Sequence, residues 1–290
     1  PIFRVPAAGG QLTPLTELDK SRKETAHAFP SFLPDGKHYL YLVRSSDPQR
    51  AAAAYVGELG SKERVYVPAI VSEVKFSPAP KGGYLVFIRD GALMVQPFDA
   101  KRLATSGEAF PLADAFVEGR SASSGPFSVS ASGDLAYLRP VTISGGAIPN
   151  TQFAWFDRKG RQLALAGPPG PYILGSIGEF IRTLVKGELR LSGFPELSPD
   201  GKFVAFSRDV PSDVWILDIE KSLTSRLTSD PAEDSFPVWS PDGRTVVFRS
   251  TRDGSGNLYT RAVGAVEEDK PLLKDEAPKF PTDWSRDGKY

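Results

Sequence analysis

The sequence predicts an all-β protein, a β-propeller of four-stranded antiparallel blades. A hairpin motif of the form Phe-Pro-x-Trp-Ser-Pro-Asp-Gly recurs along the 290 residues. Its turn glycines, at 36, 83, 133, 201, 243 and 288, are spaced by 47, 50, 68, 42 and 45 residues. Each full copy is followed by further strand-like segments. A period of 40–50 residues with four short strands is typical of a propeller blade, whereas an immunoglobulin-like sandwich needs about 100 residues per domain.

The clearest copy of the motif is FPVWSPDGRTVVFR, residues 236–249. Pro241 presets the first corner of a turn, Asp242 hydrogen-bonds its own backbone, and Gly243 takes the conformation with positive φ. The flanking residues are β-branched and aromatic, as in strands. The motif therefore predicts the first two strands of a blade, with Trp239 and Phe248 in its core.

The other elements follow in order along the chain. A half-blade of two strands is expected over residues 1–20, and a truncated last blade over residues 278–290. Between them, five repeat blades are predicted to begin near residues 27, 72, 125, 192 and 234. These copies indicate about six blades in a single domain spanning residues 1–290. Because the two partial blades stand at the ends, we interpret the chain as a fragment of a longer one.

The one long interval indicates an insertion at about residues 167–193. Its segment Ser176-Ile177-Gly178-Glu179 has the form of a capping box, and apolar residues follow at helical spacing. One interpretation is a short helix that acts as a lid or docking element. The other is a loop without a role, which Gly178 favours because glycine weakens a helix.

The composition excludes several classes of function. Lys plus Arg and Asp plus Glu number 35 each, so the net charge of zero gives no electrostatic basis for binding nucleic acid or an anionic membrane. The chain has no cysteine, which excludes disulfides, thiolate metal sites and cysteine nucleophiles. No apolar run approaches the roughly 18 residues of a membrane span, so we expect no direct membrane contact within this chain.

The repeated motif, followed by a strand ending in Phe, resembles the TolB-type, WD-like propeller repeat, most clearly over residues 194–248. Residues 2–36, with LMVQPFD at 93–99 and AWFDRKG at 154–160, resemble the C-terminal propeller region of bacterial eukaryotic-type serine/threonine kinases. That resemblance implies a sensory or interaction domain on the extracytoplasmic (periplasmic) side. The sequence contains no kinase signature, so any kinase activity would belong to a segment outside it.

Three charged or polar residues near the Phe-Pro dipeptides are candidates for binding. His27, Asp234 and Lys279 occupy similar positions in three copies, where a propeller chain approaches its central channel. They are predicted to line a ligand-binding channel mouth, and the alternative is that they are solvated loop ends. The repeat aspartates, Asp35, Asp200, Asp242 and Asp287, are expected to serve their turns, since a calcium loop needs several oxygen ligands.

We expect no catalytic residue, no cofactor and no metal. His27 and His38 are the only histidines, so a zinc site would lack a third ligand. The nucleophile elbow Gly-x-Ser-x-Gly of hydrolases does not occur. The leading hypothesis is a non-catalytic propeller that binds a protein or peptide partner, with a small ligand also possible. The alternatives are the substrate-gating propeller of a prolyl-oligopeptidase-type peptidase and a TolB-like envelope protein that docks other proteins.

Overall fold

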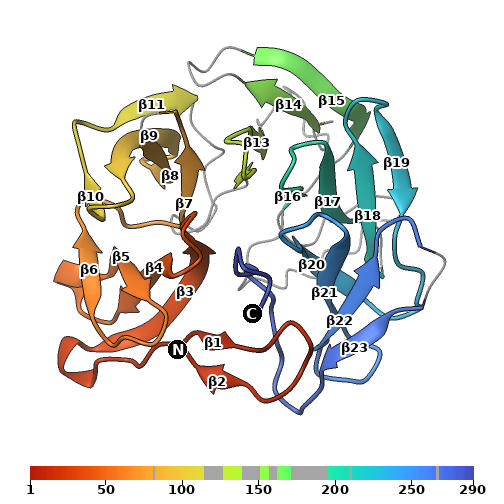
Figure 1. Ribbon diagram of the computed structural model, residues 1–290, viewed down its shortest axis with the longest axis horizontal. Coiled ribbons are helices and arrows are strands. Elements are labelled where there is room, and N and C mark those ends of the chain that lie inside the picture. The colour runs from red at the N-terminus through yellow and green to blue at the C-terminus, as the bar shows by residue number, and fades with distance from the viewer. Residues whose placement is uncertain are drawn as a thin grey trace. The chain divides into compact units, whose positions relative to one another are not determined.

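The computed structural model describes residues 1–80, 82–113, 127–138, 151–156, 162–170, 195–208, 211–265 and 268–290. The regular secondary structure of these residues is β-strand, apart from two short 3-10 turns, Lys20–Arg22 and Pro48–Arg50. The strands form separate antiparallel sheets (Figure 1). The chain divides into two compact units, Pro1–Gly125 with Thr282–Tyr290, and Pro126–Pro281. The all-β prediction is confirmed.

Unit 1 contains two large sheets. The first has the order β3-β4-β5-β6, with each strand hydrogen-bonded to the next. Its strands are β3 (Glu24–Phe32), β4 (His38–Ser45), β5 (Ala52–Glu58) and β6 (Arg64–Val67). The second sheet contains β7 (Val74–Pro78), β8 (Gly83–Arg89), β9 (Ala92–Asp99), β10 (Ala104–Thr105) and β11 (Phe110–Ala113). Both β10 and β11 pair with β9, so two short strands share the outer position of this sheet.

The first and last residues of the chain meet within unit 1. Strands β1 (Phe3–Arg4) and β2 (Thr13–Pro14) form a two-stranded sheet. The backbone N–H of Ala7 donates to the carbonyl of Lys289 at 2.7 Å, and the Arg4 guanidinium lies 4.6 Å from the centre of the Tyr290 ring. The Phe32 N–H donates to the Asp283 carboxylate at 2.6 Å. The last motif copy is therefore anchored both to the N-terminal hairpin and to the first large sheet.

Unit 2 contains three sheets of four strands in simple sequential order. The first has β12 (Phe127–Val129), β13 (Leu135–Leu138), β14 (Thr151–Phe156) and β15 (Gln162–Gly170). The second has β16 (Glu196–Leu197), β17 (Phe203–Arg208), β18 (Asp213–Asp218) and β19 (Leu223–Arg226). The third has β20 (Asp234–Trp239), β21 (Thr245–Ser250), β22 (Asn257–Ala262) and β23 (Lys270–Leu273).

The predicted number of about six four-stranded blades is wrong for the residues that the structure describes. Four sheets have four strands, one has five, and β1–β2 stands as a pair. The outer strand of the five-stranded sheet is interrupted at Gly107, which has a φ of 76°. The last copy forms its turn, with Gly288 N–H donating to the Ser285 carbonyl at 2.9 Å. Among the described residues, no strand pairs across this turn.

The turns of the motif have the predicted chemistry. Gly36 and Gly243 take φ values of 66° and 68°. The Asp242 carboxylate accepts from the Ser240 hydroxyl at 2.6 Å and from the Arg244 N–H at 3.0 Å. Hydrogen bonds of this kind to neighbouring residues are also made by Asp35, Asp200 and Asp287. The prediction that these aspartates serve their turns is confirmed, and burial of Trp239 and Phe248 is confirmed as well.

The Phe-Pro dipeptide that opens the motif marks a bulge, which the sequence did not predict. Phe29 and Phe236 have φ values of 53° and 56°, and the strand register shifts at Ala28/Ser31 and at Ser235/Val238. A positive φ is costly for a bulky residue and a following proline restricts it further. The aromatic residue is therefore held in an unfavourable conformation by the packing around it. The insertion expected at residues 167–193 lies outside the described residues from 171 onward.

The sheet β3–β6 buries residues on both faces, and this positions the candidate site. Leu40 packs on one face with residues of β7 and β8, including Val74 and Leu85. Because successive side chains alternate between faces, Tyr39 and Tyr41 lie on the other face, where they contact residues of the N-terminal segment. This second face is only partly covered, and a cleft remains there.

Candidate functional site

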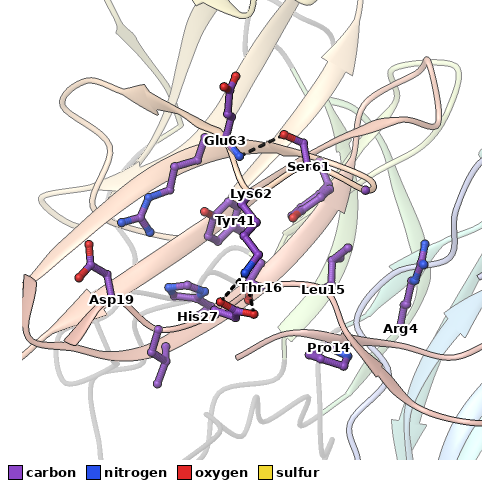
Figure 2. Close-up of a pocket in the computed structure, with 15 residues that line it drawn as sticks. Arg4, Pro14, Leu15, Thr16, Asp19, His27, Tyr41, Ser61, Lys62 and Glu63 are labelled. Carbon is purple, nitrogen blue, oxygen red and sulfur yellow. Dashed lines mark hydrogen bonds and ion pairs between the residues drawn. The ribbon is translucent and has the colours of Figure 1, made fainter. Parts of the chain in front are cut away.

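The cleft in unit 1, called here the His27 cleft, has a volume of about 530 Å³. His27, Tyr39 and Tyr41 form its floor, residues 14–19 form one wall, and residues 60–64 form the other. Arg4 lies at one end (Figure 2). Ligand sites in proteins commonly have volumes of about 300–1,000 Å³. The cleft is therefore large enough for a small molecule or a few residues of a peptide.

His27 is deeply buried in the floor, with 1% of its side chain exposed. Its Nε2 lies 2.9 Å from the Glu24 carboxylate, and its ring centre lies 5.3 Å from that of Tyr41. Glu24 and His27 are three positions apart, so on a regular strand their side chains would lie on opposite faces of the sheet. A register shift between Glu24 and Ala26 brings the two side chains to the same face. The bulge in β3 therefore creates the pair.

Glu24 is held as a carboxylate. Burial alone would raise its pKa, but hydrogen bonds from Arg64 at 2.6 Å, from the Asp19 N–H at 2.8 Å and from His27 outweigh burial and lower the pKa below 4.5. The Glu24 side chain is 1% exposed. Because a carboxylate only accepts hydrogen bonds, the proton of the His27 ring must reside on Nε2.

The His27 ring is neutral at neutral pH. Burial lowers its pKa below 6.5, and the hydrogen bond to Glu24 only partly opposes this effect. Nδ1 is consequently a bare acceptor, and it is buried without a hydrogen-bond partner among the described residues. Unpaired buried polar atoms are uncommon in folded proteins, so this one calls for an explanation.

The two walls of the cleft are joined by an exposed ion pair. Lys62 Nζ lies 3.0 and 3.2 Å from the two carboxylate oxygens of Glu17, drawn as dashed lines in Figure 2. These side chains are 85% and 71% exposed. An exposed pair contributes only about 0–1 kcal/mol. The contact can therefore separate at little cost when the cleft is occupied.

The other two predicted site residues lie in unit 2. Asp234 is fully buried on β20, and Arg252 donates to its carboxylate at 3.1 and 3.2 Å. Burial raises the pKa of Asp234, although Ser250 and Arg252 oppose the rise. Lys279 is also buried and donates to Asn257 at 3.2 Å, to the Ala277 carbonyl at 2.6 Å and to Asp275. Both residues have internal partners, and their role in binding stays a prediction.

Several residues of the His27 cleft were not found by sequence reasoning. Glu24 and Arg64 are 40 residues apart and meet only through pairing of the sheet. The alternation Tyr39-Leu40-Tyr41 is the signal that could have placed two tyrosines on one face. Among the described residues, no group of three His, Cys, Asp or Glu side chains could hold a metal. None of the described helices has the length and apolar character required to cross a membrane.

Comparison with known proteins shows what parts of this chain are similar to. Residues 179–290 match the family model of the TolB beta propeller domain, PD40. A putative TolB from Agrobacterium tumefaciens superposes with a TM-score of 0.58 at 17% identity, covering 91% of this chain and 87% of that chain. The structural likeness shows a β-propeller fold, and residues 179–290 resemble the TolB propeller family. TolB from Acinetobacter baumannii superposes with a TM-score of 0.53 at 20% identity, over 82% of this chain and 52% of that chain.

The propeller fold of this chain also occurs in enzymes. An oligogalacturonate lyase in complex with manganese superposes with a TM-score of 0.57 at 16% identity, over 99% of this chain and 75% of that chain. In sequence, 95 residues are 33% identical to an uncharacterized protein of Agrobacterium fabrum, and they make up 32% of each chain. The match therefore spans about a third of that relative's length. The structural likenesses show the fold alone.

Proposed function

We propose that this propeller is a non-catalytic interaction domain and that it binds a protein or peptide partner in the His27 cleft. The observation that carries the proposal is the cleft itself, about 530 Å³ in volume, with the Tyr39 and Tyr41 rings on its floor and charged side chains on both walls. A cleft of this size accommodates a few residues of a peptide.

The surroundings of the cleft favour binding over chemistry. The Glu24–His27 pair resembles the base and orienting residue of a hydrolase, but nucleophilic catalysis also needs an activated nucleophile within hydrogen-bond reach of the histidine. The described residues give His27 Nδ1 no such neighbour. Aromatic residues and arginine are enriched in protein interfaces, and the cleft is lined by Tyr39, Tyr41 and Arg4.

Peptide selection tests this proposal. A displayed peptide library is selected on the immobilised chain, and the recovered peptides are titrated against the variants Lys62→Glu and Lys101→Glu. Lys62→Glu places a second carboxylate opposite Glu17 on the rim, whereas Lys101 is an exposed lysine outside the cleft. We expect the first change to weaken binding and the second to leave it unaltered. Equal affinity for both variants, or turnover of a peptide or glycan panel by the wild-type chain, contradicts the proposal.

We further propose that the domain is joined to a bacterial serine/threonine kinase and works as its sensor. The proposal is supported by the segments that resemble the propeller region of such kinases, residues 2–36, 93–99 and 154–160. The complete reading frame tests it. A kinase domain upstream supports the proposal, whereas a downstream hydrolase domain supports a gating propeller of the peptidase type. A leader sequence with neither domain supports a TolB-like docking protein.

A further inference from the structure

We infer that the His27 cleft recognises a carboxylate of its ligand, and that Arg4 binds this carboxylate at one end of the cleft. The inference rests on the proposed function, because it names the chemistry of a ligand in the same cleft. It is carried by three features of Arg4. These are the absence of a charged partner among the described residues, the fixed position of the guanidinium, and its separation from the unpaired carboxylate of Glu63.

Arg4 differs from the other cationic side chains that line the cleft. Lys62 Nζ contacts the Glu17 carboxylate at 3.0 and 3.2 Å, and Arg64 donates to Glu24 at 2.6 Å. Within the part of the chain that the structure describes, Arg4 forms no ion pair, and its side chain donates only to a neutral hydroxyl. The positive charge at this end of the cleft is therefore available to a ligand.

The guanidinium of Arg4 is held in place and stays accessible. Arg4 and Thr13 face each other across the β1–β2 pair, and Arg4 Nε donates to the Thr13 hydroxyl at 3.2 Å. The guanidinium also lies 4.6 Å from the centre of the Tyr290 ring. Arg4 is nevertheless partly exposed, and its contact with Thr13 lies at the surface. A ligand in the cleft can therefore reach the guanidinium without displacing a buried group.

The Thr13 contact leaves the right donors for a carboxylate. Because Nε is engaged, the two terminal nitrogens of the Arg4 guanidinium present the N–H groups that remain, and these have no partner among the described residues. Paired N–H groups of this kind match the two oxygens of a carboxylate. Since Thr13 and Tyr290 already fix the guanidinium, binding costs little further side-chain entropy.

The other unpaired charge of the lining determines where an anion can bind. Glu63 is exposed, and its carboxylate has no cationic partner among the described residues. Figure 2 shows Glu63 well apart from Arg4, which lies beside Pro14 and Leu15. A ligand carboxylate is repelled by Glu63 and attracted by Arg4, so the two charges together fix the direction of the ligand. A phosphate, with up to two negative charges, matches the single cation less well.

Four short peptides test this inference on the full chain. N-acetyl-trialanine has a terminal carboxylate, its C-terminal amide has none, and two further amides have Asp or Lys as the middle residue. The readout is the Nε–H signal of Arg4 in the proton–nitrogen spectrum, assigned from its loss in Arg4→Gln. We expect the two peptides with a carboxylate to shift this signal and to bind about 5-fold more tightly than the neutral amide. Their relative affinities distinguish a chain terminus from an acidic side chain.

A matched variant and salt provide the controls. Arg4→Gln should remove the preference for a carboxylate, whereas Arg50→Gln, which removes an exposed arginine outside the cleft, should leave it intact. In the wild-type chain the preference should decrease when the salt concentration is raised from about 0.05 to 0.5 M, because salt screens accessible charges. Equal affinity for the acidic and neutral peptides overturns the inference. Tighter binding of the Lys peptide or of a phosphoserine peptide, or an unchanged preference in Arg4→Gln, does so as well.

The result also separates this inference from the proposed function. If the selected peptides shift the backbone signals of residues 60–64, but neither they nor the acidic peptides shift the Arg4 signal, the cleft binds a partner and the inference about the carboxylate is wrong. If no peptide shifts any signal of the cleft, both proposals are wrong.

Discussion

Removal of the Arg64 guanidinium should unfold unit 1 more readily, because it leaves Glu24 charged and buried. Arg64 donates to Glu24 at 2.6 Å, and the two side chains are 17% and 1% exposed. The change Arg64→Met keeps most of the aliphatic stem and removes the charge. It therefore tests the ion pair rather than packing.

The expected loss follows from the contacts that remain. Removing one partner of a buried ion pair typically costs about 3–5 kcal/mol. Glu24 keeps its hydrogen bonds to His27 and to the Asp19 N–H, so we expect the low end, about 3 kcal/mol. The Arg64 guanidinium also lies 4.6 Å from the centre of the Tyr55 ring. Loss of this cation–π contact lowers the free energy of unfolding by a smaller additional amount.

Equilibrium urea unfolding followed by circular dichroism measures the effect. The double variant Arg64→Met/Glu24→Gln should be about 2 kcal/mol more stable than the sum of the single changes predicts, because the glutamine needs no counter-charge. Arg22→Met is the matched control, since Arg22 lies 3.5 Å from Asp19 in an exposed pair. If Arg64→Met and Arg22→Met shift the urea midpoint equally, the assignment of a buried ion pair is refuted.

Three further predictions concern the bulge, the turn and the titration of His27. Phe236→Gly should be more stable than Phe236→Ala by about 1 kcal/mol in urea unfolding, because both variants lose the ring and only glycine tolerates the φ of 56°. A more stable alanine variant, as expected in a regular strand, would contradict this prediction. Asp242→Ala should lower the free energy of unfolding by about 1 kcal/mol, and Asp242→Asn by less, since asparagine can still accept from the Arg244 N–H. Equal losses for the two variants would show that the Asp242 carboxylate does not stabilise the turn. The free energy of unfolding should fall as pH drops below 6.5, because His27 takes up a proton at a higher pH in the unfolded chain than in the folded chain. His27→Phe should reduce this pH dependence between about pH 5 and 7. An unchanged slope in the variant would show that other groups cause the dependence.

Local chemistry made much of the fold predictable. Each Ser-Pro-Asp-Gly turn contains its own hydrogen-bond partners within five residues, as in Ser240, Asp242 and Thr245. The third copy confirms the point, because its displaced Asp134 still accepts from Ser132 at 2.6 Å. The turn of the second copy was placed one residue late, since Gly82 takes the positive φ and Gly83 begins β8. This error does not affect the predicted strands, because their alternation of buried and exposed residues was read from the flanking segments.

Most of the strands and the motif turns could be predicted from the sequence, because each depends on neighbours along the chain. The pairing of distant segments was needed to show that β10 and β11 share one sheet position and that the Ala7 N–H bonds to the Lys289 carbonyl. The His27 cleft also depends on tertiary structure. A bulge turned His27 toward Glu24 and sheet pairing brought Arg64 from 40 residues away. Buried ion pairs and unpaired acceptors arise from packing between distant segments, and no periodicity in the chain records them.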